Sequence, residues 1–156
     1  EHVAGAQRRV ASTPAASPSG REDGMATGIE LTQAGRSHPM MAGRRDGFAV
    51  PCTHRDEVVR LPEGAVRLAG NSHSEVQAFA IDRDGIDFWG MQYHPEFSPS
   101  YVGRYLGDMH RVPPQVADDL MLAERDDAAA LRLSTSPADQ GDAVRMLELC
   151  NWMARL

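Results

Sequence analysis

Hydrophobic and polar positions alternate in short runs through the middle of the chain, a pattern typical of β-strands. Glycine and proline turns separate the runs, and Asp84-Gly85 is a strong hairpin signal between the last two of them. The most apolar run, IDFWGMQY, ends at His94, which the following proline keeps in an extended conformation. The predicted strands cover residues 25–32, with Gly28 as a bulge, and residues 48–52, 58–70, 76–82 and 86–93.

The last third of the chain changes to helical spacing. Helices are predicted from Pro99 to about Met109, from Pro113-Pro114 towards Arg125, and after Ser136-Pro137. The final helix has an apolar stripe, opposed by Arg145, Glu148 and Arg155; the stripe consists of Met146, Leu149, Cys150, Met153 and Leu156. We expect the stripe, including Cys150, to pack on the core. Strands first and helices last indicate the later part of a mixed α/β domain.

The start of the chain has weaker signals. Residues 1–10 carry apolar side chains at helical spacing and are predicted to be the end of a helix. Residues 11–24 contain many proline, glycine and serine residues, which predict a loop. The chain also begins at Glu1 and not at a methionine, from which we expect that sequence upstream has been removed or was never included.

The composition is that of a globular chain. It has 156 residues, 42% of them hydrophobic and 24% charged. All 16 basic residues are arginine, 22 residues are acidic, and the net charge is −6, which disfavours a general nucleic-acid or membrane-surface binder. Neither a membrane-spanning run nor a secretory signal is evident. Two cysteines cannot form a disulfide framework, so a reducing, cytoplasmic setting is expected.

The candidate chemistry lies at the end of the most apolar strand, in Tyr93-His94-Pro95-Glu96-Phe97. A carboxylate beside an imidazole can fix its tautomer and stabilise the imidazolium, which leaves the other ring nitrogen free to take a proton from a nucleophile. The alternative is that His94 and Glu96 form a polar turn that caps a core strand. These residues alone leave both interpretations open.

Three segments, in order, resemble class I, triad-type glutamine amidotransferases, the family that includes the amidotransferase domain of GMP synthase. FWGMQYHPEF (88–97) resembles the family's His/Glu segment, and THRDEVVRLPEGAVRLAGNSHSEVQAF (53–79) and GREDGMATGIELTQAGRSHPM (20–40) resemble the segments before it. Residues 98–156 resemble the helical tail of stand-alone members. The resemblance implies an α/β, flavodoxin/Rossmann-like mixed sheet with flanking helices and without its N-terminal part. Residues 1–110 would form the amidotransferase domain, and residues 111–156 a helical extension packed on it.

The resemblance also implies a function. A Cys-His-Glu triad would hydrolyse the side-chain amide of glutamine, with His94 as general base and Glu96 as the residue that orients and stabilises it. The loop of Thr53, His54, Arg55 and Asp56 would hold the substrate's α-carboxylate and amino groups, partly through its backbone. A synthetase partner or ammonia-acceptor enzyme would use the ammonia, and no cofactor, nucleic acid or membrane is implied.

The chain departs from the family pattern at the nucleophile. The family's cysteine lies on a sharp strand-to-helix turn in a Gly-x-Cys-x-Gly type pattern, which this sequence lacks. Cys52 has no neighbouring glycine to form such a turn, so we expect it to behave as a small hydrophobe. The nucleophile would then lie upstream of Glu1, and this chain alone would be inactive. The alternative is a non-catalytic, amidotransferase-like remnant that acts as an interaction module.

Other candidate sites have less support. The side chains of His54, Asp56, His94 and Glu96 fit no zinc-ligand spacing, so a metal site is disfavoured. No Gly-Lys-Ser/Thr phosphate loop supports ATP use. Arg44-Arg45 is predicted to be solvated surface.

Overall fold

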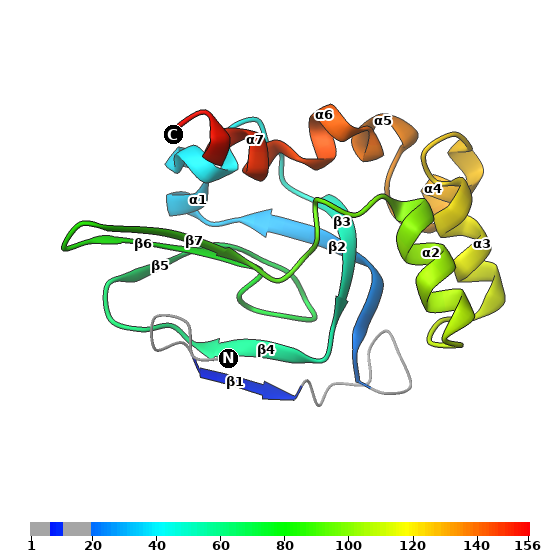
Figure 1. The fold of residues 1–156 in the computed structure, drawn as a ribbon, viewed down its shortest axis with the longest axis horizontal. Helices are drawn as coiled ribbons and strands as arrows, with labels where there is room; N and C mark the ends of the chain where they lie inside the picture. Colours follow the sequence, from blue (N-terminus) through cyan, green and yellow to red (C-terminus); the bar gives the residue numbers. More distant parts are fainter. Residues whose placement is uncertain (1–6, 11–19) are drawn as a thin grey trace.

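The structure is a computed structural model that describes residues 7–10 and 20–156, with side chains from residue 20 onwards. Most of its strands precede most of its helices (Figure 1). The strands are β1 (Gln7–Val10), β2 (Glu22–Leu31), β3 (Phe48–His54), β4 (Asp56–Arg60), β5 (Ala65–Gly70), β6 (Ala78–Arg83) and β7 (Ile86–Met91). The helices are α1 (Gln33–Ser37), the 3₁₀-helix η1 (Pro39–Met41), α2 (Pro99–Asp108), α3 (Pro114–Leu122), α4 (Asp127–Arg132), α5 (Pro137–Gln140), α6 (Asp142–Arg145) and α7 (Leu147–Met153).

Five strands form the main sheet in the order β3-β2-β5-β6-β7. Within the described residues, every strand pair is antiparallel. The sequence predicted the hairpin between β6 and β7, and Asp84 and Gly85 both adopt the positive φ angles (53° and 78°) that such a tight turn requires. The predicted bulge is also present: the register of β2 against β3 shifts between Ala26 and Ile29, and Gly28 lies at φ 59°.

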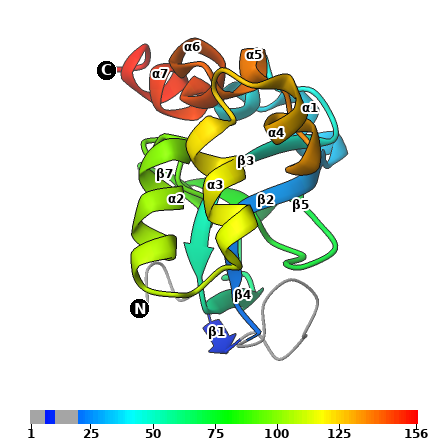
Figure 2. The ribbon, with the colours of Figure 1, turned by 90° about the vertical axis from the view of Figure 1, so that its right-hand side faces the viewer.

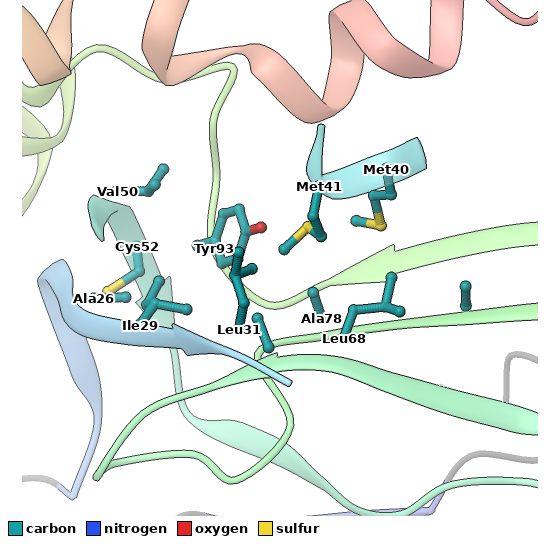
Figure 3. Packing of buried hydrophobic residues seen from close by; sticks show 12 residues of the cluster. Ala26, Ile29, Leu31, Met40, Met41, Val50, Cys52, Leu68, Ala78 and Tyr93 are labelled. Carbon is teal, nitrogen blue, oxygen red and sulfur yellow. The ribbon is translucent and has the colours of Figure 1, made fainter. Parts of the chain in front are cut away.

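The main hydrophobic core lies between the sheet and the helices of residues 33–41 and 137–153 (Figure 3). Ile29 and Leu31 of β2, and Val50 and Cys52 of β3, contribute to it from alternate positions, because successive strand residues point to opposite faces. Tyr93 is the largest of its fully buried side chains. The cluster consists of Ala26, Ile29, Leu31, Met40, Met41, Val50, Cys52, Leu68, Ala69, Ala78, Ala80 and Tyr93.

Two groups of helices flank the sheet. Helices α2 and α3 pack against each other and against β2, and Figure 2 views the molecule from their side. They approach closely because Gly103 has no side chain: a Cβ there would lie 2.8 Å from the carbonyl oxygen of Ala117. Helices α5, α6 and α7 follow one another along the other side, where α5 contacts β3 and α7 contacts η1 (Figure 1).

The C-terminal segment corrects the prediction of one continuous helix with an inward apolar stripe. It is broken into α5, α6 and α7, and burial does not follow the predicted faces. Arg145 and Glu148 are buried, whereas Met153 and Leu156 are 65% and 85% exposed. The burial of Arg145 and Glu148 has a physical reason, because both charged side chains bond to polar groups of other elements. Cys150 is exposed as well, so its predicted packing role was wrong.

The sequence predictions also failed near the N-terminus and in two short helices. Residues 7–10 form a strand that pairs with β4, where a helix end was predicted, and residues 1–6 and 11–19 lie outside the described residues. The turn predicted after residue 32 contains α1, which Thr32 caps by accepting a hydrogen bond from the Gly35 N–H. Helix α4 was not predicted; Asp126 caps it by accepting from the Ala129 N–H.

Candidate functional site

His94 and Glu96 lie in the loop between β7 and α2, and their side chains meet. The Nδ1 atom of His94 is 2.7 Å from Oε1 of Glu96. The ring of His94 also stacks on Phe97, with 4.9 Å between the ring centroids. The two side chains are 34% and 44% exposed, so the pair is rigidly supported on one side and reachable from solvent on the other. The carboxylate can hold the proton on Nδ1, which makes Nε2 the basic nitrogen.

Residues 53–56, predicted to be a substrate-binding loop, form the end of β3, the bend at Arg55 and the start of β4, and they lie beside the histidine loop. The backbone N–H of His94 donates to the carbonyl oxygen of Pro51 at 2.8 Å. The side-chain amide of Gln92 donates to the carbonyl oxygen of Asp56 at 3.0 Å. The fold therefore brings together the two segments that the sequence pointed to, through one bond between backbone groups and one bond from a side chain to the backbone.

The side chains of Thr53 and His54, which were predicted to bind substrate, make internal contacts. Thr53 donates its hydroxyl to Asp23 at 2.8 Å, and Nε2 of His54 lies 2.7 Å from Oε2 of Glu22. The His54 side chain is only 10% exposed. Arg55 is exposed and Asp56 is partly exposed. Thr53 and His54 can therefore contact a ligand only through groups other than these engaged side-chain atoms, such as their backbone.

Glu22 is the centre of a buried polar cluster behind this loop. Its carboxylate accepts hydrogen bonds from the side-chain amides of Asn71 at 2.7 Å and Gln77 at 2.6 Å, in addition to its contact with His54. Burial by itself raises the pKa of Glu22, but the hydrogen bonds from His54, Asn71 and Gln77 and the charge of His54 outweigh it. The net pKa lies below the ordinary value for glutamate, so the carboxylate is ionised.

Cys52 is buried in the core, as the sequence analysis expected (Figure 3). Its Sγ lies 3.4 Å from the carbonyl oxygen of Glu22. Burial and the nearby charges of Glu22 and Asp23 raise the pKa of this thiol well above its ordinary value. A nucleophilic cysteine needs a thiolate and access to substrate. Cys52 has neither, because its pKa is raised and its side chain is buried.

The residues that bind the histidine loop from the protein interior were not predicted from the sequence. Arg145 donates to the backbone carbonyls of Pro95 and Phe97, and Glu148 accepts from the Tyr93 hydroxyl at 2.7 Å. Arg44, predicted to be surface, instead pairs with Glu148 at 2.7 Å, and its side chain is 3% exposed. The sequence contained only a weak signal for these contacts: Arg145 and Glu148 are three residues apart on the predicted polar face of the final helix.

Two further observations bound the chemistry of the described residues. No group of three or more His, Cys, Asp or Glu side chains among them is placed to hold a metal ion. Likewise, no helix in the described part of the chain is long and apolar enough to cross a membrane.

The sequence matches a family model described as glutamine amidotransferase class-I over residues 15–109. It is 51% identical over 77 residues to a gamma-glutamyl-L-1-hydroxyisopropylamide hydrolase of a Pseudomonas species, a match covering 49% of this chain and 26% of that protein. It is 42% identical over 69 residues to one subunit of the glutamine-hydrolyzing GMP synthase of Methanoculleus marisnigri, covering 44% and 36% of the two chains. The chain thus matches only about a quarter to a third of the length of these relatives.

Solved structures confirm the expected fold. A glutamine amidotransferase from Thermotoga maritima superposes with a TM-score of 0.58 at 20% identity, covering 97% of this chain and 54% of that one. A glutamine amidotransferase from Methylobacillus flagellatus gives a TM-score of 0.57 at 16% identity, covering 94% and 56%. Both matches extend over nearly the whole chain, so the sheet and the C-terminal helices belong to one shared fold.

Proposed function

The chain belongs to the class-I glutamine amidotransferase family, and on that premise we propose that it carries the base and acid residues of a site that hydrolyses the side-chain amide of glutamine. The observation that carries the proposal is the 2.7 Å contact between His94 and Glu96, on a loop that is open to solvent on one side. A histidine held in this way is a general base whose tautomer is fixed.

In the first half of the reaction, a cysteine supplied by sequence outside this chain gives its proton to Nε2 of His94. The thiolate attacks the amide carbon of glutamine, and backbone N–H groups stabilise the oxyanion. The C–N bond then breaks, and the His94 imidazolium protonates the departing nitrogen, which leaves as ammonia. Glu96 stabilises the imidazolium throughout this half.

The second half releases the glutamyl group. His94 takes a proton from water, and the resulting hydroxide attacks the thioester carbon. The C–S bond breaks, glutamate is formed, and the His94 imidazolium returns its proton to the leaving sulfur, which restores the thiol. The same nitrogen of His94 therefore handles a proton in each half, so Glu96 must hold the ring in one orientation during the whole cycle.

The loop of Thr53, His54, Arg55 and Asp56 is proposed to hold the α-carboxylate and amino groups of the substrate. Arg55 has the charge for the carboxylate, and Asp56 has the charge for the ammonium group. The side chains of Thr53 and His54 support this segment from inside the protein, because they bind Asp23 and Glu22.

A second candidate substrate is a γ-glutamyl amide whose leaving group is a larger amine than ammonia. The Pseudomonas relative, at 51% identity, is named for the hydrolysis of a γ-glutamyl amide that carries a hydroxyisopropyl group in place of hydrogen. The same base and acid would cleave either amide, because only the leaving nitrogen differs. By analogy with the GMP synthase relative, a synthetase partner or an acceptor enzyme is proposed for the ammonia-producing case, and a cytoplasmic location with it.

The test uses a protein that contains this chain together with the sequence encoded upstream of Glu1. A Gly-x-Cys-x-Gly pattern in that sequence, ammonia release from glutamine, and loss of that release in His94→Ala are the expected results. The 156-residue chain alone is expected to release no ammonia. A longer protein that lacks the cysteine and releases no ammonia would favour the non-catalytic interaction module. Ammonia release by the short chain, abolished in Cys52→Ser, would overturn the assignment of the nucleophile.

A further inference from the structure

We propose that Arg145 and Glu148 are positioning residues that hold the His94 loop in the geometry its base requires. This inference rests on the proposed function, and it assigns a catalytic task to the C-terminal helices, outside the residues matched by the family model. Neither residue is proposed to touch the substrate.

Arg145 binds the backbone on the C-terminal side of His94. Its guanidinium donates to the carbonyl oxygen of Pro95, to that of Phe97 at 2.9 Å, and to that of Gln140 at 3.3 Å. The loop has no regular secondary structure, so these inward carbonyls have no strand partner and need a donor. A guanidinium carries five N–H donors in one rigid plane and can therefore fix several carbonyls relative to one another.

Glu148 binds the residue on the N-terminal side of His94. Its Oε1 accepts a hydrogen bond of 2.7 Å from the Tyr93 hydroxyl. Burial and the neighbouring carboxylate raise the pKa of Tyr93 well above its ordinary value, so the phenol keeps the proton that it donates. The Tyr93 ring also packs edge-on against Phe48, with 5.8 Å between centroids. Tyr93 is thus fixed at both its ring and its hydroxyl.

Arg44 connects the two positioning residues. It donates to both carboxylate oxygens of Glu148 at 2.7 Å and to the carbonyl oxygen of Arg145, also at 2.7 Å. The side chains of Arg145 and Glu148 are 3% and 0% exposed. Burying charged groups is costly unless each finds partners. The partners here include residues that flank His94, together with Arg44 for Glu148 and Asp142 for Arg145.

The consequence for catalysis is geometric. His94 is held by its own N–H bond to Pro51, by Tyr93 before it and by the carbonyls of Pro95 and Phe97 after it. A general base must lie within hydrogen-bond reach of the proton it removes, and a displacement of about 1 Å can lower a rate by about a hundredfold. A loop released on one side would leave the His94–Glu96 contact intact but move the pair relative to the nucleophile.

The experiment uses the full protein that contains the upstream nucleophile. Arg145→Gln removes the charge and part of the donor set, Arg145→Lys keeps the charge and places its donors on a single nitrogen, and Tyr93→Phe removes only the hydroxyl. Arg132→Gln is the control: Arg132 of α4, whose side chain is about half exposed, makes two hydrogen bonds of 2.7 and 2.9 Å to Asp119 of α3. The readouts are kcat and KM for glutamine, thermal stability, and amide hydrogen exchange.

We expect Arg145→Gln to lower kcat by about tenfold to a hundredfold while KM stays within about twofold. Arg145→Lys should recover part of the lost kcat. Tyr93→Phe should lower kcat by a smaller factor in the same way. Arg132→Gln should keep the wild-type kcat even where its melting temperature falls. An unchanged kcat in folded Arg145→Gln and Tyr93→Phe, or an equal loss in Arg132→Gln, would overturn the proposal.

Hydrogen exchange separates this proposal from the proposed function. The backbone N–H of His94 donates to the carbonyl oxygen of Pro51, and the N–H of Phe97 donates to the carbonyl oxygen of His94. Both amides should exchange about tenfold faster in Arg145→Gln, whereas the β6 amides should be unchanged. If the wild-type protein releases no ammonia, or His94→Ala keeps the activity, the proposed function fails and the exchange data still report on the loop. Unchanged loop amides in both Arg145→Gln and Tyr93→Phe would show that the C-terminal helices do not hold it.

Discussion

The imidazole of His54 lies with Nε2 2.7 Å from Oε2 of Glu22, inside the molecule and away from the solvent-facing side of the histidine loop. His54 was expected to bind substrate, and its side chain instead belongs to the cluster that also contains Asn71 and Gln77. This cluster ties the start of β2 to the end of β3 and to the segment between β5 and β6. The segment predicted to bind substrate, residues 53–56, is therefore held by a buried cluster of polar side chains.

The Glu22 cluster predicts a specific acid sensitivity. Because the folded-state pKa is lowered, the stabilisation by Glu22 is fully present above the ordinary glutamate pKa of about 4.3 and is lost as the pH falls through the lowered folded value. Glu22→Gln should cost about 3 kcal/mol at neutral pH, because a neutral amide cannot accept all three hydrogen bonds. Urea unfolding from about pH 7 to about pH 3 should show a shallower pH dependence in the variant. Parallel curves would contradict this role.

The buried carboxylate of Asp23 predicts a coupled loss of stability. Asp23 accepts hydrogen bonds from Arg111 at 2.8 and 2.9 Å, and it also binds Arg21 and Thr53. Arg111→Met should destabilise the protein by about 2–3 kcal/mol, since Asp23 is left with fewer partners. A double-mutant cycle with Asp23→Asn should give a coupling energy of about 1 kcal/mol or more. Arg104→Met, at an exposed position on α2, is the control and should change stability by under about 0.5 kcal/mol.

The two cysteines should differ sharply in reactivity. Cys150 is exposed, whereas Cys52 is buried and its pKa is raised. A thiol-alkylating reagent followed by peptide mapping should label Cys150 at least about a hundredfold faster than Cys52 in the folded protein. The difference should disappear in denaturant. Fast labelling of Cys52 under native conditions would show that the core around β2 and β3 opens readily.

Close packing of α1 on β5 predicts that Gly35 cannot be replaced. A Cβ at Gly35 would lie 2.0 Å from the carbonyl oxygen of Leu68, and backbone cannot move aside cheaply. Gly35→Ala should cost about 3 kcal/mol or more in unfolding free energy. Gly141→Ala is the matched control, because the nearest atom to its Cβ would be 3.7 Å away, and it should stay within about 0.5 kcal/mol of wild type. Equal costs would contradict the packing argument.

Local signals predicted much of the sheet and the central pair of the site. The hairpin at Asp84-Gly85 follows from turn chemistry, and the bulge at Gly28 follows from a glycine within a strand pattern. The contact of His94 with Glu96 spans two residues across a proline, so the chain itself keeps the side chains near each other. None of these features depends on distant parts of the sequence.

Contacts between distant residues could not be predicted in the same way. Glu22 and His54 are 32 residues apart, and Arg44 and Glu148 are 104 apart, so no periodicity records their pairing. The C-terminal pattern was misleading for the same reason. An amphipathic pattern assumes that charged residues face water, and the assumption fails where Arg145 and Glu148 find polar partners in the interior.

The distance along the chain between the histidine loop and its anchors bears on the order of events during synthesis. Pro95 leaves the ribosome 50 residues before Arg145, and Tyr93 leaves 55 residues before Glu148. Because chains emerge from the N-terminus, the strands can pair before either anchor exists. Arg145 and Glu148 can therefore bind the loop around His94 only after α6 and α7 have been synthesised, so this loop would be the last part of the sheet region to be fixed.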